Sequence, residues 1–127
     1  MIVVDETSLI DTPRDASGPG WRSLRLLTRA DGMGFSINNT IVAAGASLTL
    51  QYKNHLEGCY CISGHGWVTD HATGTRHEIK PGTLYALDQH DHHTLSVTDG
   101  EDMRLISVFN PALEGSETHG PDGSYSA

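Results

Sequence analysis

The sequence predicts a single all-β domain, built as a sandwich or barrel of antiparallel strands. Short runs rich in Val, Ile, Thr, Leu and Tyr recur about every 8 to 12 residues, a spacing typical of such folds. No helical periodicity persists beyond a turn or two. The 127 residues suffice for one compact core but are few for two domains, so we expect one domain covering residues 1–127.

Nine strands are expected, at residues 22–28, 34–43, 47–53, 57–62, 66–70, 75–79, 83–87, 93–98 and 103–109. Turn-forming pairs separate them, and each pair supplies a residue that tolerates a positive φ or presets a turn. These pairs are Asp31-Gly32, Ala44-Gly45, Ser63-Gly64, Thr73-Gly74, Pro81-Gly82 and Asp99-Gly100. These turn-forming pairs predict a succession of β-hairpins.

Both ends of the chain are expected to be mostly irregular, which leaves the barrel at about residues 20–110. Residues 5–20 contain two Pro and two Gly, and the tail at 111–127 carries Pro111, Gly115, Gly120, Pro121 and Gly123. For the tail, two alternatives stay open. It either frays in solvent or folds over the mouth of the barrel as an active-site lid.

The charge and the N-terminus exclude several classes of partner. The formal net charge is -8 and only eight Lys and Arg are present, which argues against binding nucleic acid. The start, Met1 to Asp5, lacks the features of a signal peptide, and no apolar run reaches 18 residues. We therefore expect a cytoplasmic protein with no membrane partner. Cys59 and Cys61 are too few for a Cys-based zinc site and are expected to be buried, reduced thiols.

Unusual polar residues gather in two clusters, residues 51–57 and 85–93, each at the end of an expected strand. Because alternate residues of a strand share a face, Glu57 would point with Cys59 and Cys61. Tyr85 lies in a neighbouring strand, and His93 begins the strand that returns from it. A carboxylate, a phenolate and an imidazole could converge on Fe(II), Mn(II) or Zn(II). The alternative is that these are rim residues and a solvated loop.

The framework around these residues resembles the two cupin motifs. Gly45, Glu57 and Gly64 have the spacing of the first motif, but Gln51 and Lys53 stand where two metal-binding His would be. The second motif appears as Pro81-Gly82-Thr83-Leu84-Tyr85, with Tyr85 in the place of a His. The resemblance implies a cupin (jelly-roll) β-barrel with an unusual set of ligands.

That departure is the pattern of the ectoine synthases, which the chain resembles over nearly its whole length. The shared runs include Trp21-x3-Arg25-Leu26-Leu27, residues 31–36, Tyr52-x-Asn54-His55-Leu56-Glu57, Tyr60-Cys61-Ile62, residues 80–88, His90-Asp91-x-His93, residues 101–105 and Phe109-Asn110-Pro111. Two places differ from the family: Gly58-Cys59 replaces an expected Ala-Val, and residues 37–39 also depart from its pattern. Neither place includes a ligand that the resemblance implies.

The resemblance implies an iron-dependent enzyme that closes N-γ-acetyl-L-2,4-diaminobutyrate to ectoine, a compatible solute, with loss of water. It implies Fe(II), with Zn(II) or Mn(II) as substitutes, held by Glu57, Tyr85 and His93, and a head-to-tail homodimer. The catalytic pair would be Tyr52 and His55. The residues implied to bind the substrate are Trp21, Arg25, Asn38, Thr40, Ser107 and Phe109.

Two other functions remain as alternatives. A different cupin enzyme, such as a dioxygenase or an isomerase, could use the same barrel, although the missing pair of His argues against it. A non-catalytic module that binds a small molecule is the second alternative, because a fold does not determine a function.

Overall fold

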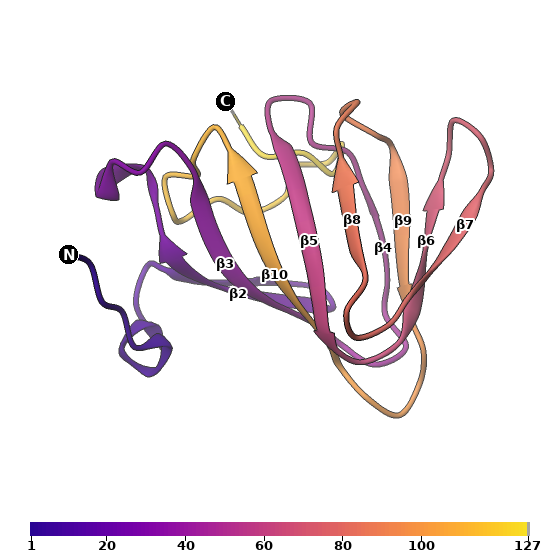
Figure 1. Cartoon of the computed structure of the whole chain (residues 1–127), viewed down its shortest axis with the longest axis horizontal. Helices are drawn as coiled ribbons and strands as arrows, with labels where there is room; N and C mark the ends of the chain where they lie inside the picture. The colour runs from indigo at the N-terminus through magenta and orange to yellow at the C-terminus, as the bar shows by residue number, and fades with distance from the viewer. Residues whose placement is uncertain (127) are drawn as a thin grey trace.

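The strands of the protein form two antiparallel sheets that face each other, as the computed structural model of residues 1–126 shows (Figure 1). Ala127, the last residue of the predicted tail, lies outside the described residues. The six-stranded sheet has the order β1 (Asp15–Gly18), β2 (Trp21–Leu27), β3 (Ser36–Val42), β10 (Met103–Asn110), β5 (Leu56–Ser63) and β8 (Leu84–Leu87). The four-stranded sheet has the order β4 (Ser47–Leu50), β9 (His93–Val97), β6 (Gly66–Asp70) and β7 (Arg76–Ile79). The predicted all-β class is confirmed.

Helical structure within residues 1–126 is limited to two 3₁₀ turns, η1 (Glu6–Leu9) and η2 (Arg29–Asp31). In that part of the chain, no helix is long and apolar enough to cross a membrane.

The nine predicted strands all form, with ends that shift by a few residues. The largest shift is in β4, which ends at Leu50 although the strand was expected to reach residue 53. Beyond Leu50 the chain leaves its partner β9, and the Gln51 amide donates instead to the Gly123 carbonyl of the tail at 3.0 Å. The strand ends where the tail replaces a neighbouring strand.

Strand β1 was not predicted, because residues 5–20 were expected to be irregular. Its sequence, Asp-Ala-Ser-Gly, is poor in residues that favour strands. Pairing with β2 holds it, and Arg22 forms two hydrogen bonds with the Asp15 carboxylate, at 2.9 and 2.8 Å. The partner strand thus imposes an extended conformation that local propensity does not favour.

Strand β5 shows how alternation builds the interior. Glu57, Cys59 and Cys61 are buried, whereas Tyr60 and Ile62 are exposed on the outer face. The prediction that the first three share a face is confirmed, and both thiols are free and buried as expected. Toward one end of the barrel the facing sheets enclose an apolar cluster: Val42, Cys59, Cys61, Val68, Ile79, Leu95, Val97, Met103 and Leu105.

The tail packs against the barrel at two places, residues 112–115 and 123–125. Leu113 is fully buried, and its amide donates to the Ser36 hydroxyl while its carbonyl accepts from the Arg29 amide. Further along, Tyr125 is 4% exposed and joins a second apolar cluster with Tyr52, Leu87, Phe109 and Leu113. In Figure 1 the tail, drawn in yellow, crosses the end of the barrel at the top of the view. Packing of this kind argues against a frayed tail.

Candidate functional site

A cavity lined by both apolar and polar side chains lies between the two sheets, and part of its wall belongs to the apolar cluster. Nine of the eleven residues singled out from the sequence line it: Trp21, Asn38, Thr40, Tyr52, Glu57, Tyr85, His93, Ser107 and Phe109. The free volume of the cavity is about 30 Å³, enough for one or two ordered water molecules. The fold therefore brings most of the predicted site together from strands that are distant in the sequence.

The three predicted ligands reach the cavity from both sheets. Glu57 lies on β5, and Tyr85 lies on β8, where it pairs in register with Cys59. His93 is the first residue of β9 in the opposite sheet. Glu57 is 8% exposed and His93 is 2% exposed, so neither side chain is a surface group.

Glu57 is a buried carboxyl group with no cation beside it. Burial raises its pKa to about 7, although hydrogen bonds with the Cys59 and Ser107 side chains act in the opposite direction. None of the ion pairs found among residues 1–126 involves Glu57. A carboxylate in this position would be stabilised by a bound cation.

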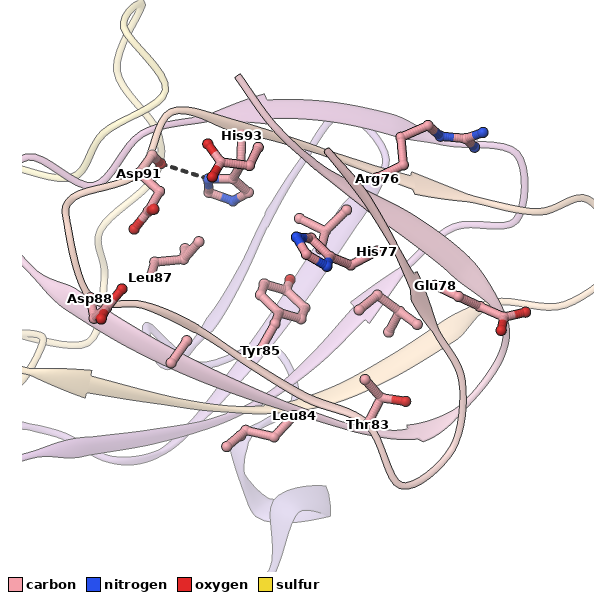
Figure 2. Close-up of a pocket in the computed structure, with 14 residues that line it drawn as sticks. Arg76, His77, Glu78, Thr83, Leu84, Tyr85, Leu87, Asp88, Asp91 and His93 are labelled. Atoms are coloured by element: carbon pink, nitrogen blue, oxygen red, sulfur yellow. Dashed lines mark hydrogen bonds between the residues drawn. The ribbon is translucent and has the colours of Figure 1, made fainter. Parts of the chain in front are cut away.

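His93 lines the cavity, and one of its two ring nitrogens is already held by a backbone hydrogen bond. Its Nδ1 donates to the Asp91 carbonyl at 2.9 Å, the hydrogen bond drawn in Figure 2, and this leaves Nε2 as the acceptor. Burial lowers the pKa of His93, which favours the neutral imidazole that binds metals. Burial also raises the pKa of Tyr85 well above its usual value, so without a cation this side chain is a phenol.

Tyr85 and His93 also border a groove on the flank of the barrel, between the unpaired edges of β7 and β8 (Figure 2). Charged and polar side chains line the groove: Asp70, Arg76, His77, Glu78, Asp88 and Asp91. The two predicted ligands thus lie between the interior cavity and this groove.

The residue types fit a borderline divalent cation only if Tyr85 takes part. Within residues 1–126, no group of three or more His, Cys, Asp and Glu is gathered so that it could hold a metal ion by itself. Gln51 and Lys53, which occupy the usual His places, do not line the cavity; Lys53 instead pairs with Asp122 at 3.3 Å. A metal here would need one carboxylate, one imidazole and one phenolate, an O,O,N donor set.

Tyr52 and His55, the predicted catalytic pair, occupy different positions. Tyr52 lines the cavity, and its hydroxyl is hydrogen-bonded to Nε2 of His119 at 2.8 Å. His55 is 2% exposed but lies behind the wall, with its ring edge-on to Phe109 at 5.9 Å and to Tyr125 at 6.3 Å. Its Nδ1 has no hydrogen-bond partner. Of the two, only Tyr52 borders the open space.

Arg25 likewise lies behind the cavity wall and is fully buried. Its Nε donates to the Ser23 hydroxyl at 2.9 Å, and its Nη2 donates to the Glu117 carbonyl oxygen at 2.9 Å. Nη1 is 3.9 Å from the Glu117 carboxylate and has no hydrogen-bond partner. Asn38, which pairs in register with Arg25, has an unpaired Oδ1. A buried donor and a buried acceptor therefore lie close together without hydrogen-bond partners of their own.

Sequence reasoning missed several residues that the structure adds to the cavity wall: Ser23, Cys59, His119 and Tyr125. His119 and Tyr125 come from the tail, where no strand pattern predicts which side chains turn inward. The available signal was their residue type, since an imidazole and a phenol are unusual in a segment rich in Gly and Pro.

Comparisons with known proteins place the chain in a family. The family model described as ectoine synthase matches residues 1–127. The chain belongs to the ectoine synthase family. An L-ectoine synthase from Desulfosudis oleivorans is 54% identical over 125 residues, which are 98% of this chain and 96% of that protein.

Solved structures agree with the family assignment. An ectoine synthase from P. lautus superimposes with a TM-score of 0.85 at 43% identity, covering 91% of this chain and 82% of that one. A cupin-2 domain from Rhodospirillum rubrum has a TM-score of 0.63 at 16% identity, covering 72% and 60% of the two chains, and so shares the fold alone. The predicted cupin barrel and the resemblance to the ectoine synthases are both confirmed.

Proposed function

We propose that this member of the ectoine synthase family closes N-γ-acetyl-L-2,4-diaminobutyrate to ectoine, as a carbon–oxygen hydro-lyase that depends on Fe(II). In this reaction the α-amine nitrogen attacks the acetamide carbonyl carbon. A C–N bond forms, the carbonyl oxygen takes up protons and leaves as water, and a C=N bond remains. The observation that carries the proposal is one cavity lined by a carboxyl, a phenol and an imidazole. Two buried polar atoms without hydrogen-bond partners, Arg25 Nη1 and Asn38 Oδ1, lie near it.

The metal would be held by Glu57, Tyr85 and His93. Support comes from the buried carboxyl of Glu57, which has no cation partner, and from the His93 ring, whose Nδ1 is already held by the Asp91 carbonyl. Fe(II) is the proposed ion, with Zn(II) or Mn(II) as substitutes, because each accepts oxygen and nitrogen donors. When bound, such an ion supplies a Lewis acid that polarises the acetyl carbonyl.

The head group of the substrate matches two buried groups without hydrogen-bond partners, Asn38 on the cavity wall and Arg25 behind it. Arg25 Nη1 is a cationic donor for the α-carboxylate, and Asn38 Oδ1 is an acceptor for an N–H of the α-amine. Because these residues are paired across β2 and β3, they would hold both substituents of the same α-carbon. Orientation of this kind places the amine for attack on the carbonyl.

The remaining wall completes the pocket. Thr40 and Ser107 are hydrogen-bonded to each other at 2.9 Å and offer hydroxyls to the substrate. Trp21 and Phe109 are buried aromatic side chains that exclude water from the reacting centre.

Proton transfer is assigned to Tyr52 and His55. Burial, followed by the nearby Glu57 carboxylate, raises the pKa of Tyr52 well above its usual value. The phenol therefore stays protonated and can donate to the developing oxyanion. Burial lowers the pKa of His55 and keeps its ring neutral, as a base for the amine must be. His55 contacts Phe109 and Tyr125 rather than the cavity, so it would act through a small shift of these rings or through a water.

The test is turnover of the acetylated diamino acid by the purified protein, with and without Fe(II), and with product identification by NMR. Glu57→Ala and His93→Ala should lose both bound iron, measured by elemental analysis, and activity. Full activity in metal-free protein would contradict the iron dependence. Oxygen consumption would favour the dioxygenase alternative, and binding without turnover would favour the binding module.

We also propose a head-to-tail homodimer in the cytoplasm. The outer face of the six-stranded sheet supports the dimer, because it exposes Leu56, Tyr60, Leu84 and Val108. The two unpaired thiols fit a reducing compartment. Light scattering of the purified protein would test the dimer, and a monomer at micromolar concentration would contradict it.

A further inference from the structure

Tyr125, near the end of the tail, inserts an aromatic ring into the wall of the cavity. The side chain is 4% exposed. Its ring stacks on His119 with a centroid distance of 4.6 Å and an interplanar angle of 9°. It also contacts Tyr52 at 5.1 Å and Phe109 at 5.6 Å. The barrel thus fixes the position of a side chain that lies 100 residues from Arg25.

Three hydrogen bonds from the segment after β4 hold residues 123–125 of the tail at this insertion. The Gln51 amide donates to the Gly123 carbonyl at 3.0 Å, and the Lys53 amide donates to the Ser124 hydroxyl at 3.0 Å. The Asn54 side-chain amide donates to the Tyr125 carbonyl at 2.9 Å. The segment after β4 therefore serves as a docking edge for residues 123–125.

The Tyr125 hydroxyl lies against the guanidinium of Arg25. Arg25 Nη2 donates to this hydroxyl at 3.3 Å as well as to the Glu117 carbonyl oxygen, while Nε is held by Ser23. A guanidinium is planar and rigid, so fixing Nε and Nη2 also fixes Nη1. Nη1 is the buried nitrogen that has no hydrogen-bond partner.

We propose that Tyr125 is a positioning residue for the substrate carboxylate, which acts by holding Arg25 so that Nη1 stands ready for the anion. The inference rests on the proposed function, in which Arg25 binds that carboxylate. It makes the tail part of substrate recognition. By linkage, docking of the tail and binding of the carboxylate strengthen each other by the same factor.

Tyr125→Phe tests this role, because it removes the hydroxyl and keeps the stacked ring. We expect KM for the acetylated diamino acid to rise about tenfold, the effect of losing a hydrogen bond to a charged group, with little change in kcat. The inhibition constant of the α-carboxamide of the same substrate should not change, because this analogue lacks the anion. A merely structural role would alter both constants alike.

Two further variants complete the experiment. Ser124→Ala loosens the tail but keeps the Tyr125 hydroxyl, so by the same linkage it should raise KM for the substrate by a smaller factor than Tyr125→Phe and leave the carboxamide constant unchanged. Arg25→Gln should raise KM at least as much as Tyr125→Phe and leave the carboxamide constant unchanged.

The outcomes separate this inference from the proposed function. The inference is overturned if KM is unchanged in Tyr125→Phe, or if KM for the substrate and the inhibition constant of the carboxamide shift equally. Normal turnover by the wild type leaves the proposed function in place in either case. If Arg25→Gln shifts KM and the carboxamide inhibition constant equally, Arg25 does not bind the carboxylate, which overturns this inference and the role of Arg25 in the proposed function. No turnover by the wild type contradicts the proposed function and this inference with it.

Discussion

The Tyr52 hydroxyl lies 2.8 Å from Nε2 of His119, so a side chain at the exit of β4 is hydrogen-bonded to one from the tail inside the cavity. Tyr52 is fully protonated near neutral pH, because its pKa is raised by burial. The pair joins the barrel and the tail at the place where the reaction is proposed to occur.

Removing the Tyr52 hydroxyl should slow the chemical step. We expect Tyr52→Phe to lower kcat about 100-fold, the usual size of a general-acid contribution, with a smaller change in KM. Steady-state kinetics at saturating Fe(II) measures both constants. Tyr60→Phe is the matched control, because Tyr60 lies on the outer face and is 46% exposed. A kcat within twofold of wild type in Tyr52→Phe would remove Tyr52 from the proton transfer.

Docking of the tail should weaken as the pH falls below about 6.5. Burial, together with the charges of Arg25 and His93, lowers the pKa of His119 to about 4. Between this lowered pKa and the ordinary His pKa of 6.5, His119 of the undocked tail binds a proton that His119 of the docked tail does not. Docking therefore weakens by up to about tenfold for each pH unit, and it is constant above pH 6.5. The Glu117 carboxyl, which also faces Arg25, has a lowered pKa and changes little above pH 5.

Hydrogen exchange can follow this equilibrium. The amides of Gln51 and Lys53 donate to the tail, so their protection factors should fall between pH 7 and pH 5. In His119→Gln the fall should disappear. Protection that is independent of pH in the wild type would show that His119 does not titrate with docking.

The sequence predicted the parts of the site that sit on regular strands. Alternation along one strand predicted that Glu57 shares a face with Cys59 and Cys61, and the burial of these three residues confirms it. His119 and Tyr125 could not be found in this way, because long-range hydrogen bonds rather than a repeating pattern turn the tail inward. Strand β1 was missed for a related reason, since its extended conformation comes from pairing with β2. Local patterns predict elements well when the elements bury one face, and poorly when a distant partner shapes them.

Gly64 should be intolerant of a side chain. It closes the hairpin between β5 and β6 with φ of 87°, and an added Cβ would lie 2.6 Å from the Asp102 carbonyl oxygen. Gly64→Ala should therefore combine backbone strain with a collision and cost more than about 2 kcal/mol of unfolding free energy. Gly74→Ala is the matched control, because its φ is 74° but open space surrounds it. Urea unfolding should show a clearly larger loss for Gly64→Ala, and equal losses would refute the collision.

Glu57 should destabilise the metal-free protein above neutral pH. Its pKa in the folded chain is about 7, against 4.5 for an ordinary Glu, so the unfolded state is more ionised between these values. The folded state therefore loses stability as the pH rises through this window, by about 3 kcal/mol at most. Glu57→Gln should remove the loss, so that the metal-free variant is more stable than the metal-free wild type at pH 8. Urea unfolding of both proteins at pH 5 and pH 8 measures the difference. Iron should then stabilise the wild type and leave the variant unchanged, because only the wild type offers the ion a carboxylate. Equal pH dependence in the two metal-free proteins would mean that the Glu57 carboxylate finds a compensating partner in the folded chain.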